Sequence, residues 1–236
     1  ILRDGFVYDG IDRIAQELSA TLLDFGYPPC PGKIMANNPY WCKSLQEFKD
    51  QLFQWVIEFQ EPLLNLAIFC DAIAVAGDAS LLEEANNYLY DRLQDHQTFF
   101  SHFAKPTIAF ETPLGFFANF IVEKSQHKNE LDIKKGGIFP VVHGIRSLSL
   151  EHRIMQTNTV ERIKALTEKG VFERSFAADL MESLCFMISL RLRFELERVA
   201  RNEVYDNYIK PNQLNKLERD LLKDSLKIVN SFKQFI

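Results

Sequence analysis

Several features that define common protein classes are scarce or missing in this sequence. Glycine and proline number only 10 and 9 among 236 residues, which leaves little material for long loops or many tight turns. The cysteines, Cys30, Cys42, Cys70 and Cys185, form no Cys-x-x-Cys pair, so neither a zinc site nor a disulfide scaffold is supported. No apolar run approaches the roughly 18 residues of a membrane-spanning helix. We therefore expect a cytoplasmic protein without a membrane partner.

A strong positive charge is also absent. The chain carries 27 Lys and Arg against 32 Asp and Glu, for a net charge of −5. Residues 1–100 hold 15 acidic and 6 basic residues, whereas residues 101–236 hold 17 acidic and 21 basic ones. An acidic chain lacks the dense basic surface that nucleic acids require, so we expect no nucleic-acid partner. The mild basic excess of the second half is compatible with ordinary solvated helices or with a local anion site.

Hydrophobic residues make up 47% of the chain, and many of them recur at helical spacing. The 20 phenylalanines require a large aromatic core. This spacing predicts a mainly α fold, a helical bundle, with few strands. Capping boxes are expected at Ser44 with Glu47 and at Ser80 with Glu83. Helices are predicted at residues 10–25, 45–59, 63–73, 80–103, 141–154, 159–169, 175–203 and 213–235, and short strands at 33–36, 117–122 and 130–133.

The segment Asp132-Ile-Lys134-Lys135-Gly136-Gly137 runs from a predicted strand into a helix. A glycine turn before a helix exposes backbone N–H groups, and the two lysines add positive charge, which is suitable chemistry for a phosphorylated ligand. The spacing differs from that of a P-loop, and an ordinary loop is the alternative.

Cationic side chains follow on the next helix. His143, Arg146, Leu150 and Arg153 share one face at helical spacing, and Arg146 has the fork geometry that binds a phosphate. An ion-paired, solvated face is the alternative. The sequence Arg146-x5-His152 also fits the short Arg-x(4–6)-His pattern of HEPN-type ribonucleases.

Three further residues have both a structural and a binding interpretation. Asn158 is suited to cap the helix at 159–169, with Glu161 as its capping-box partner, and Arg162 follows in the first turn. Arg191 lies on an inward face of the helix at 175–203, where it either pairs with Glu195 or binds a ligand.

Signatures of other chemistries are missing. His96, His102 and His127 are isolated, and no His-Glu-x-x-His motif or nucleophile motif occurs. We therefore expect no metal ligand and no catalytic residue in this chain.

Three segments together resemble a known family. They are Phe25–Trp41 (FGYPPCPGKIMANNPYW), Ala67–Leu81 (AIFCDAIAVAGDASL) and Leu131–Arg146 (LDIKKGGIFPVVHGIR), the last followed by TNTVERI at 157–163. They resemble a bacterial nucleotidyltransferase family whose members often carry upstream CBS and cyclic-nucleotide-binding domains. That family is similar to the amino-terminal region of the PII-protein uridylyltransferase.

The resemblance implies two parts, the tail of a nucleotidyltransferase α/β domain at residues 1–60 and a helical substrate-binding domain at 61–236. It also implies that Ile1 and Leu2 end a strand that follows the catalytic motif, so that the chain is a fragment. The family's Gly-Ser turn and Asp-x-Asp pair, which hold Mg²⁺ and the nucleoside triphosphate, do not occur in this chain. In the family, the acidic residue that corresponds to Asp71 is followed two positions later by an Arg. In this chain that position is occupied by Ile73.

The resemblance therefore predicts a carboxy-terminal part of a uridylyltransferase-like signalling enzyme that binds nucleotide and a protein of the PII type. The expected binding residues are Lys134, Lys135, Arg146, Asn158, Arg162 and Arg191. Mg²⁺ and the nucleoside triphosphate are expected for the full-length parent, with none held tightly by this fragment. The alternative is a non-catalytic regulatory or interaction module that relays signals from upstream sensor domains.

Overall fold

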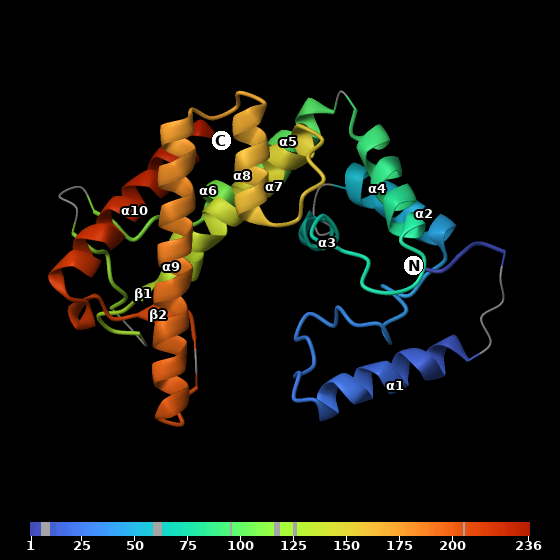
Figure 1. The fold of residues 1–236 in the computed structure, drawn as a ribbon, viewed down its shortest axis with the longest axis horizontal. Helices are drawn as coiled ribbons and strands as arrows, with labels where there is room; N and C mark the ends of the chain where they lie inside the picture. Colours follow the sequence, from blue (N-terminus) through green and yellow to red (C-terminus); the bar gives the residue numbers. More distant parts are fainter. Residues whose placement is uncertain (6–9, 59–62, 95, 116–118, 125–126, 205) are drawn as a thin grey trace. The chain divides into compact units, whose positions relative to one another are not determined.

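The computed structural model describes residues 1–236 except 6–9, 59–62, 95, 116–118, 125–126 and 205 (Figure 1). The described residues are mostly helical, which confirms the predicted fold class. They form two compact units, Ile1–His96 and Gln97–Ile236. Residues 61–96, which we assigned with the helical domain, thus group with the first unit. No described helix is long and apolar enough to cross a membrane.

The first unit is built around the contact between α2 (Leu45–Ile57) and α4 (Ser80–Arg92), with α3 (Leu63–Phe69) against α2. Ser44 and Glu47 form the predicted capping box at the start of α2. In the core, Phe48 packs its ring 5.3 Å from that of Phe69. Within the described part of this unit, pairing of extended backbone is limited to an isolated bridge between Leu2 and Ser44.

Helix α1 (Ile11–Asp24) forms where the apolar spacing predicted it, yet it buries little. Ala15 is its single buried residue, whereas Ile14 and Leu18 are 56% and 50% exposed. The spacing therefore identified the helix correctly without locating a partner for its apolar face.

Three predictions for residues 33–103 are wrong. Residues 33–36 form no strand, because Lys33 adopts a positive φ of 55° at the end of a Cys30–Lys33 turn. The predicted helix 80–103 is divided into α4 and α5 (Gln97–Ala104). Its N-cap is Ala79 rather than Ser80, because Ser80 itself donates hydrogen bonds to Asp78.

The second unit is a helical bundle. Its long elements are α7 (Phe139–Glu151), α8 (Thr159–Glu168), α9 (Arg174–Ala200) and α10 (Lys216–Phe235), and α9 packs along α10 (Figure 1). A one-turn π-helix (Lys134–Ile138) leads directly into α7, and the short helices α5 and α6 (Pro106–Ala109) pack against α7. All four long helices match predicted ones to within a few residues.

A two-stranded antiparallel sheet joins distant parts of this unit. β1 (Leu131–Asp132) pairs with β2 (Tyr208–Ile209), with Leu131 opposite Ile209. β1 lies inside the strand predicted at 130–133. A short 3-10 helix (Pro211–Gln213) leads from β2 toward α10. Residues 117–118 of the other predicted strand lie outside the described residues, and its remainder contributes an isolated bridge from Phe120 to Leu114.

Helix α9 has two apolar faces. One face belongs to the core, where Leu180 and Met187 are fully buried. The opposite face presents aliphatic side chains that are about half exposed, namely Ile188, Leu192, Leu196 and Val199.

Candidate functional site

The Lys134–Ile138 turn is held by Asp132 and by tight packing. The backbone N–H of Lys135 donates to Oδ1 of Asp132 at 2.8 Å, and its Nζ lies 3.8 Å from Oδ2 of the same residue. Both lysine side chains are exposed, while Gly136 and Gly137 are buried. The turn therefore presents cations on its outer side and packs its glycines inward.

The two glycines have a packing explanation. A Cβ at Gly136 would collide with the ring of Pro113, and a Cβ at Gly137 would collide with the sulfur of Met187. The glycines are thus required by neighbouring side chains, independently of any anion bound to the backbone.

The cavity beside Lys135 is acidic. It has a volume of about 260 Å³, and its charged lining residues are Glu111, Glu123, Asp132 and Lys135. Burial and the nearby carboxylates, Asp132 and Glu123 first, raise the pKa of Tyr208, which also lines it. A phosphate would meet three carboxylates here, so the cavity itself does not favour an anion.

His143 and Arg146 form a fixed pair on α7. His143 is buried, and its Nε2 lies 2.7 Å from the carbonyl oxygen of Phe103, which can only accept. Its ring stacks on Phe139 at 5.3 Å. Nη1 of Arg146 lies 3.4 Å from the other ring nitrogen, Nδ1, which therefore acts as the acceptor. His143 positions the guanidinium of Arg146, which stays partly exposed.

The predicted face of α7 is only partly correct. Leu150 is buried, and Arg153 lies beyond the end of the helix with a positive φ of 52°. His152 caps the helix six residues after Arg146, a spacing that separates the two side chains by about 120° around the axis. The two residues of the ribonuclease-like pattern therefore do not share a face.

Helix α8 packs against α7 and contributes Asn158 and Arg162. Oδ1 of Asn158 accepts from the backbone N–H groups of Val160 and Glu161 at 2.9 and 3.3 Å, so Asn158 is the helix cap. Arg162 is only 3% exposed, and its Nε donates to the carbonyl oxygen of Gln156 at 2.5 Å. The structure thus brings two arginines, Arg146 and Arg162, onto neighbouring helices.

Arg191 is paired within its own helix. Its Nη2 lies 2.8 Å from Oε1 of Glu195, the i,i+4 partner expected from the sequence. Arg198, one turn further along α9, contacts Asp206 at 2.8 Å and Glu130 at 3.5 Å. The reason is that β1 and β2 bring these two acidic residues to the second half of α9.

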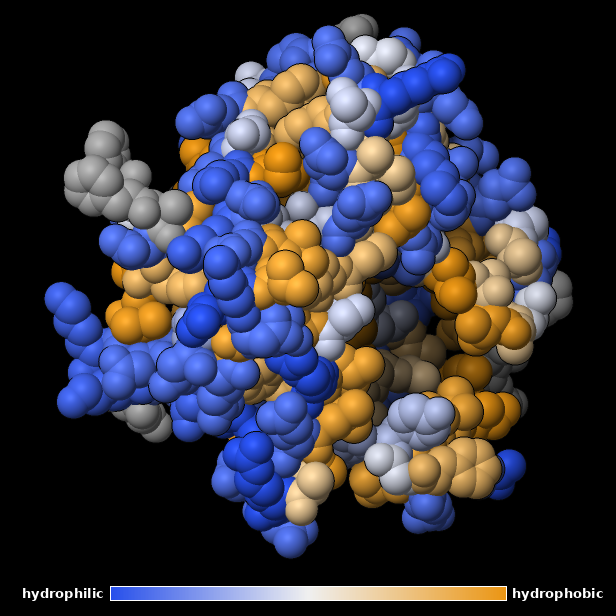
Figure 2. Space-filling view, turned by 60° about the vertical axis from the view of Figure 1, so that its left-hand side comes forward, coloured by the Kyte–Doolittle hydropathy of each residue, from blue (hydrophilic) through white to orange (hydrophobic). Residues whose placement is uncertain are grey.

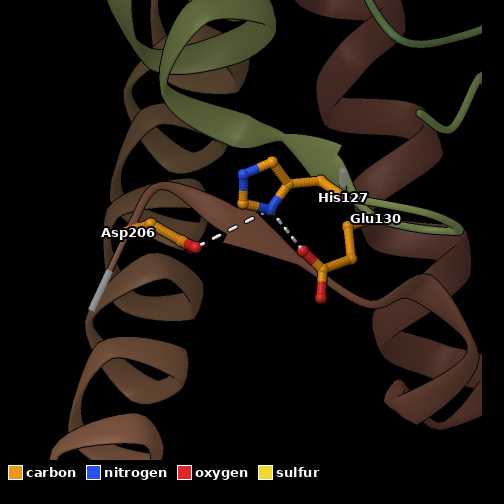
Figure 3. A group of neighbouring side chains, drawn as sticks. All are labelled: His127, Glu130 and Asp206. Carbon is orange, nitrogen blue, oxygen red and sulfur yellow. Dashed lines mark hydrogen bonds and ion pairs between the residues drawn. The ribbon is translucent and has the colours of Figure 1, made fainter. Parts of the chain in front are cut away.

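Sequence reasoning missed the cluster around His127. Nδ1 of His127 lies 3.0 Å from Oε2 of Glu130 and 3.8 Å from Oδ2 of Asp206 (Figure 3). The His127 ring stacks on Tyr208 at 3.6 Å. The two acids are distant from each other in sequence, so no local spacing signals the group.

The ligand atoms of His127, Glu130 and Asp206 lie within 4.8 Å of one another, close enough to surround a metal ion. However, Arg198 contacts both carboxylates, and Lys210 lies 3.4 Å from Glu130. Burial alone would raise the pKa of Glu130, but the hydrogen bonds from His127 and Lys210 and the charge of Arg198 hold it below its usual value. The cluster is therefore a neutralised ion network that ties β1 to α9.

The first unit contains a separate, mainly apolar cavity of about 650 Å³. Trp41, Phe48 and the segment 71–78 line it. Asp78 accepts hydrogen bonds from Ser80 and contacts Arg3, and the Ser80 hydrogen bonds lower its pKa. Asp78 thus fixes the backbone at the start of α4.

The second unit is a helical domain that presents exposed or partly exposed cations on its α7 side and carries no recognised catalytic motif. Residues 97–236, which have the bounds of the second unit, match the family model described as a putative nucleotidyltransferase substrate binding domain. Residues 1–61, which form part of the first unit, match the model described as a putative nucleotidyltransferase. The chain belongs to this nucleotidyltransferase family. No curated protein and no solved structure matches it.

Proposed function

We propose that residues 97–236 bind the substrate of a uridylyltransferase-like nucleotidyltransferase, and that Arg146 holds a phosphate of that substrate. One observation carries the proposal: the compact unit Gln97–Ile236 has the same bounds as the matched substrate-binding family domain. A domain that folds around its own core and matches that family is suited to bind substrate for a separate catalytic domain.

Arg146 is the strongest candidate among the predicted residues. It is partly exposed, and His143 holds one of its nitrogens, so little side-chain freedom is lost when it binds an oxyanion. Lys134 and Lys135 precede α7 and add exposed positive charge, although the ammonium group of Lys135 also forms an ion pair with Asp132. Asn158 and Arg162 support the geometry of α8, and Arg191 is engaged by Glu195.

The chemistry of nucleotidyl transfer does not fit this chain alone. Mg²⁺ with a nucleoside triphosphate needs paired carboxylates, and the sequence contains no Asp-x-Asp pair or Gly-Ser turn. The His127 cluster is already neutralised by Arg198 and Lys210. In this proposal, the chain binds the nucleotide and a protein substrate of the PII type in the cytoplasm. The metal is bound by the parent enzyme.

Isothermal titration calorimetry of the full-length parent protein with UTP and with ATP, in the presence of Mg²⁺, tests the binding role. A charge-assisted hydrogen bond contributes about 1.5–3 kcal/mol, so Arg146→Ala should weaken binding by roughly 10- to 100-fold. Lys164→Ala, which removes an exposed cation paired with Glu161 on α8, is the matched control and should leave the affinity unchanged. An unchanged affinity in Arg146→Ala would refute the role of Arg146.

A second candidate function is a non-catalytic relay for upstream CBS or cyclic-nucleotide-binding domains. The replacement of the family's Arg by Ile73 favours it. The relay predicts that neither nucleotide binds, whereas the substrate-binding proposal predicts heat of binding that depends on Arg146.

A further inference from the structure

Helix α9 carries an apolar surface outside the core, which we call the α9 stripe: Cys185, Ile188, Leu192, Leu196 and Val199. The four aliphatic side chains are 46–59% exposed, and Cys185 is exposed as well. At 100° per residue all five positions fall within about 80° of arc, so they form one continuous line. The space-filling view shows apolar side chains among polar ones on the face of the molecule that it presents (Figure 2).

The spacing of the stripe is symmetric about Leu192. Ile188 and Leu196 lie four residues to either side of it, and Cys185 and Val199 lie seven residues to either side. Steps of three and four residues are those that let one helix pack against another along a seam. The spacing of these side chains is the same in both directions along the helix. Each of them can therefore face an equivalent position on an antiparallel copy, as a two-fold interface requires.

The charge next to the stripe is balanced. Glu195 lies about 60° from Leu192 around the helix axis, and it is paired within the helix with Arg191, which lies toward the core. An antiparallel second copy would therefore meet no uncompensated charge along this edge.

From these observations we propose that α9 pairs antiparallel with α9 of a second copy of this chain, with the two Leu192 side chains on the two-fold axis. Ile188 then packs on the partner's Leu196, and Cys185 on the partner's Val199. Four half-exposed aliphatic side chains offer less than the ~800 Å² per partner of a standard interface, so the dimer should dissociate in the micromolar range.

Sedimentation equilibrium of the full chain tests the proposal. Leu192→Glu places two carboxylates together on the axis and should raise the dissociation constant at least tenfold. Ile108→Glu changes an exposed isoleucine of α6, away from the stripe, and should leave the dissociation constant unchanged. Circular dichroism confirms that both variants are folded. A wild-type chain that is monomeric at 200 µM, or a dimer unaffected by Leu192→Glu, would overturn the proposal.

Disulfide trapping distinguishes the orientation. In a background with Cys30, Cys42 and Cys70 changed to serine, oxidation should not link two native Cys185 residues. Adding Val199→Cys should produce a covalent dimer, because this residue faces the partner's Cys185. A Cys185–Cys185 dimer would show a parallel pair, and a monomeric chain whose Cys185 resists thiol reagents would show that its own first unit covers the stripe. Either result contradicts the proposal.

Discussion

Asp206 accepts a hydrogen bond from Arg198 at 2.8 Å, and this contact joins the loop after α9 to the helix itself. Arg198 also approaches Glu130 at 3.5 Å, so one guanidinium connects α9 with both sides of the β1–β2 pair. Its side chain is only 16% exposed. The contact is therefore well shielded from solvent, unlike most surface ion pairs.

Removal of Arg198 should destabilise the second unit. Arg198→Ala leaves two mostly buried carboxylates with fewer cations, and we expect a loss of about 2–4 kcal/mol in the free energy of unfolding. Arg201→Ala is the control, because Arg201 forms an exposed pair with Glu197, and it should cost less than about 1 kcal/mol. Urea unfolding of both variants measures the difference, and equal losses would contradict the shielded role of Arg198.

The same cluster predicts an acid-sensitive contribution to stability. The pKa of Glu130 is below 4.5 in the folded protein, so its ionised form stabilises the fold above about pH 4.5. That contribution is lost as the pH falls through the lowered pKa. The difference in unfolding free energy between wild type and Glu130→Gln should therefore be largest near neutral pH and shrink below pH 4.5. Denaturant curves from pH 3 to 7 measure it, and a difference independent of pH would reject this assignment.

Gly137 should be intolerant of alanine despite its place in a helical turn. Alanine usually favours a helix by about 1 kcal/mol over glycine. Here the added Cβ collides with the sulfur of Met187, and overpacking of this kind costs about 1–3 kcal/mol. Gly137→Ala should lower the melting temperature, and the double variant with Met187→Ala should show less than the sum of the two losses. Simple additivity would mean that the collision is relieved elsewhere.

Loss of the His143 ring nitrogens should affect both stability and binding. His143→Phe keeps an aromatic ring against Phe103 and Phe139 but leaves the Phe103 carbonyl without this donor. We expect a loss of about 1–3 kcal/mol in stability. If His143 also positions Arg146, nucleotide affinity should fall in the folded variant as well. Thermal melts and calorimetry on the same samples separate the two effects.

Local signals in the sequence predicted the helical elements well. Ser44 and Glu47 marked the start of α2, and Asn158 marked the start of α8, because caps act over three residues. The break after α4 was missed because apolar spacing continues from Leu81 to Phe103. The segment between α4 and α5 contains no glycine or proline, so no local sequence signal indicated the end of the first helix.

The candidate site was predicted less completely, for a different reason. Arg191 and Glu195 are one turn apart, and their pairing could be read directly. His127 and Asp206 meet only because β1 pairs with β2, a contact between distant segments. Gly136 and Gly137 were attributed to an anion loop because their true neighbours, Pro113 and Met187, are remote in sequence.

The β1–β2 pair has a mechanical consequence. Its strand β1 ends two residues before the Lys134–Ile138 turn, and the other strand follows the end of α9. Because Arg198 ties the segments that lead into both strands to α9, a continuous series of contacts runs from the second half of α9 through the β1–β2 pair to the Lys134–Ile138 turn and the start of α7.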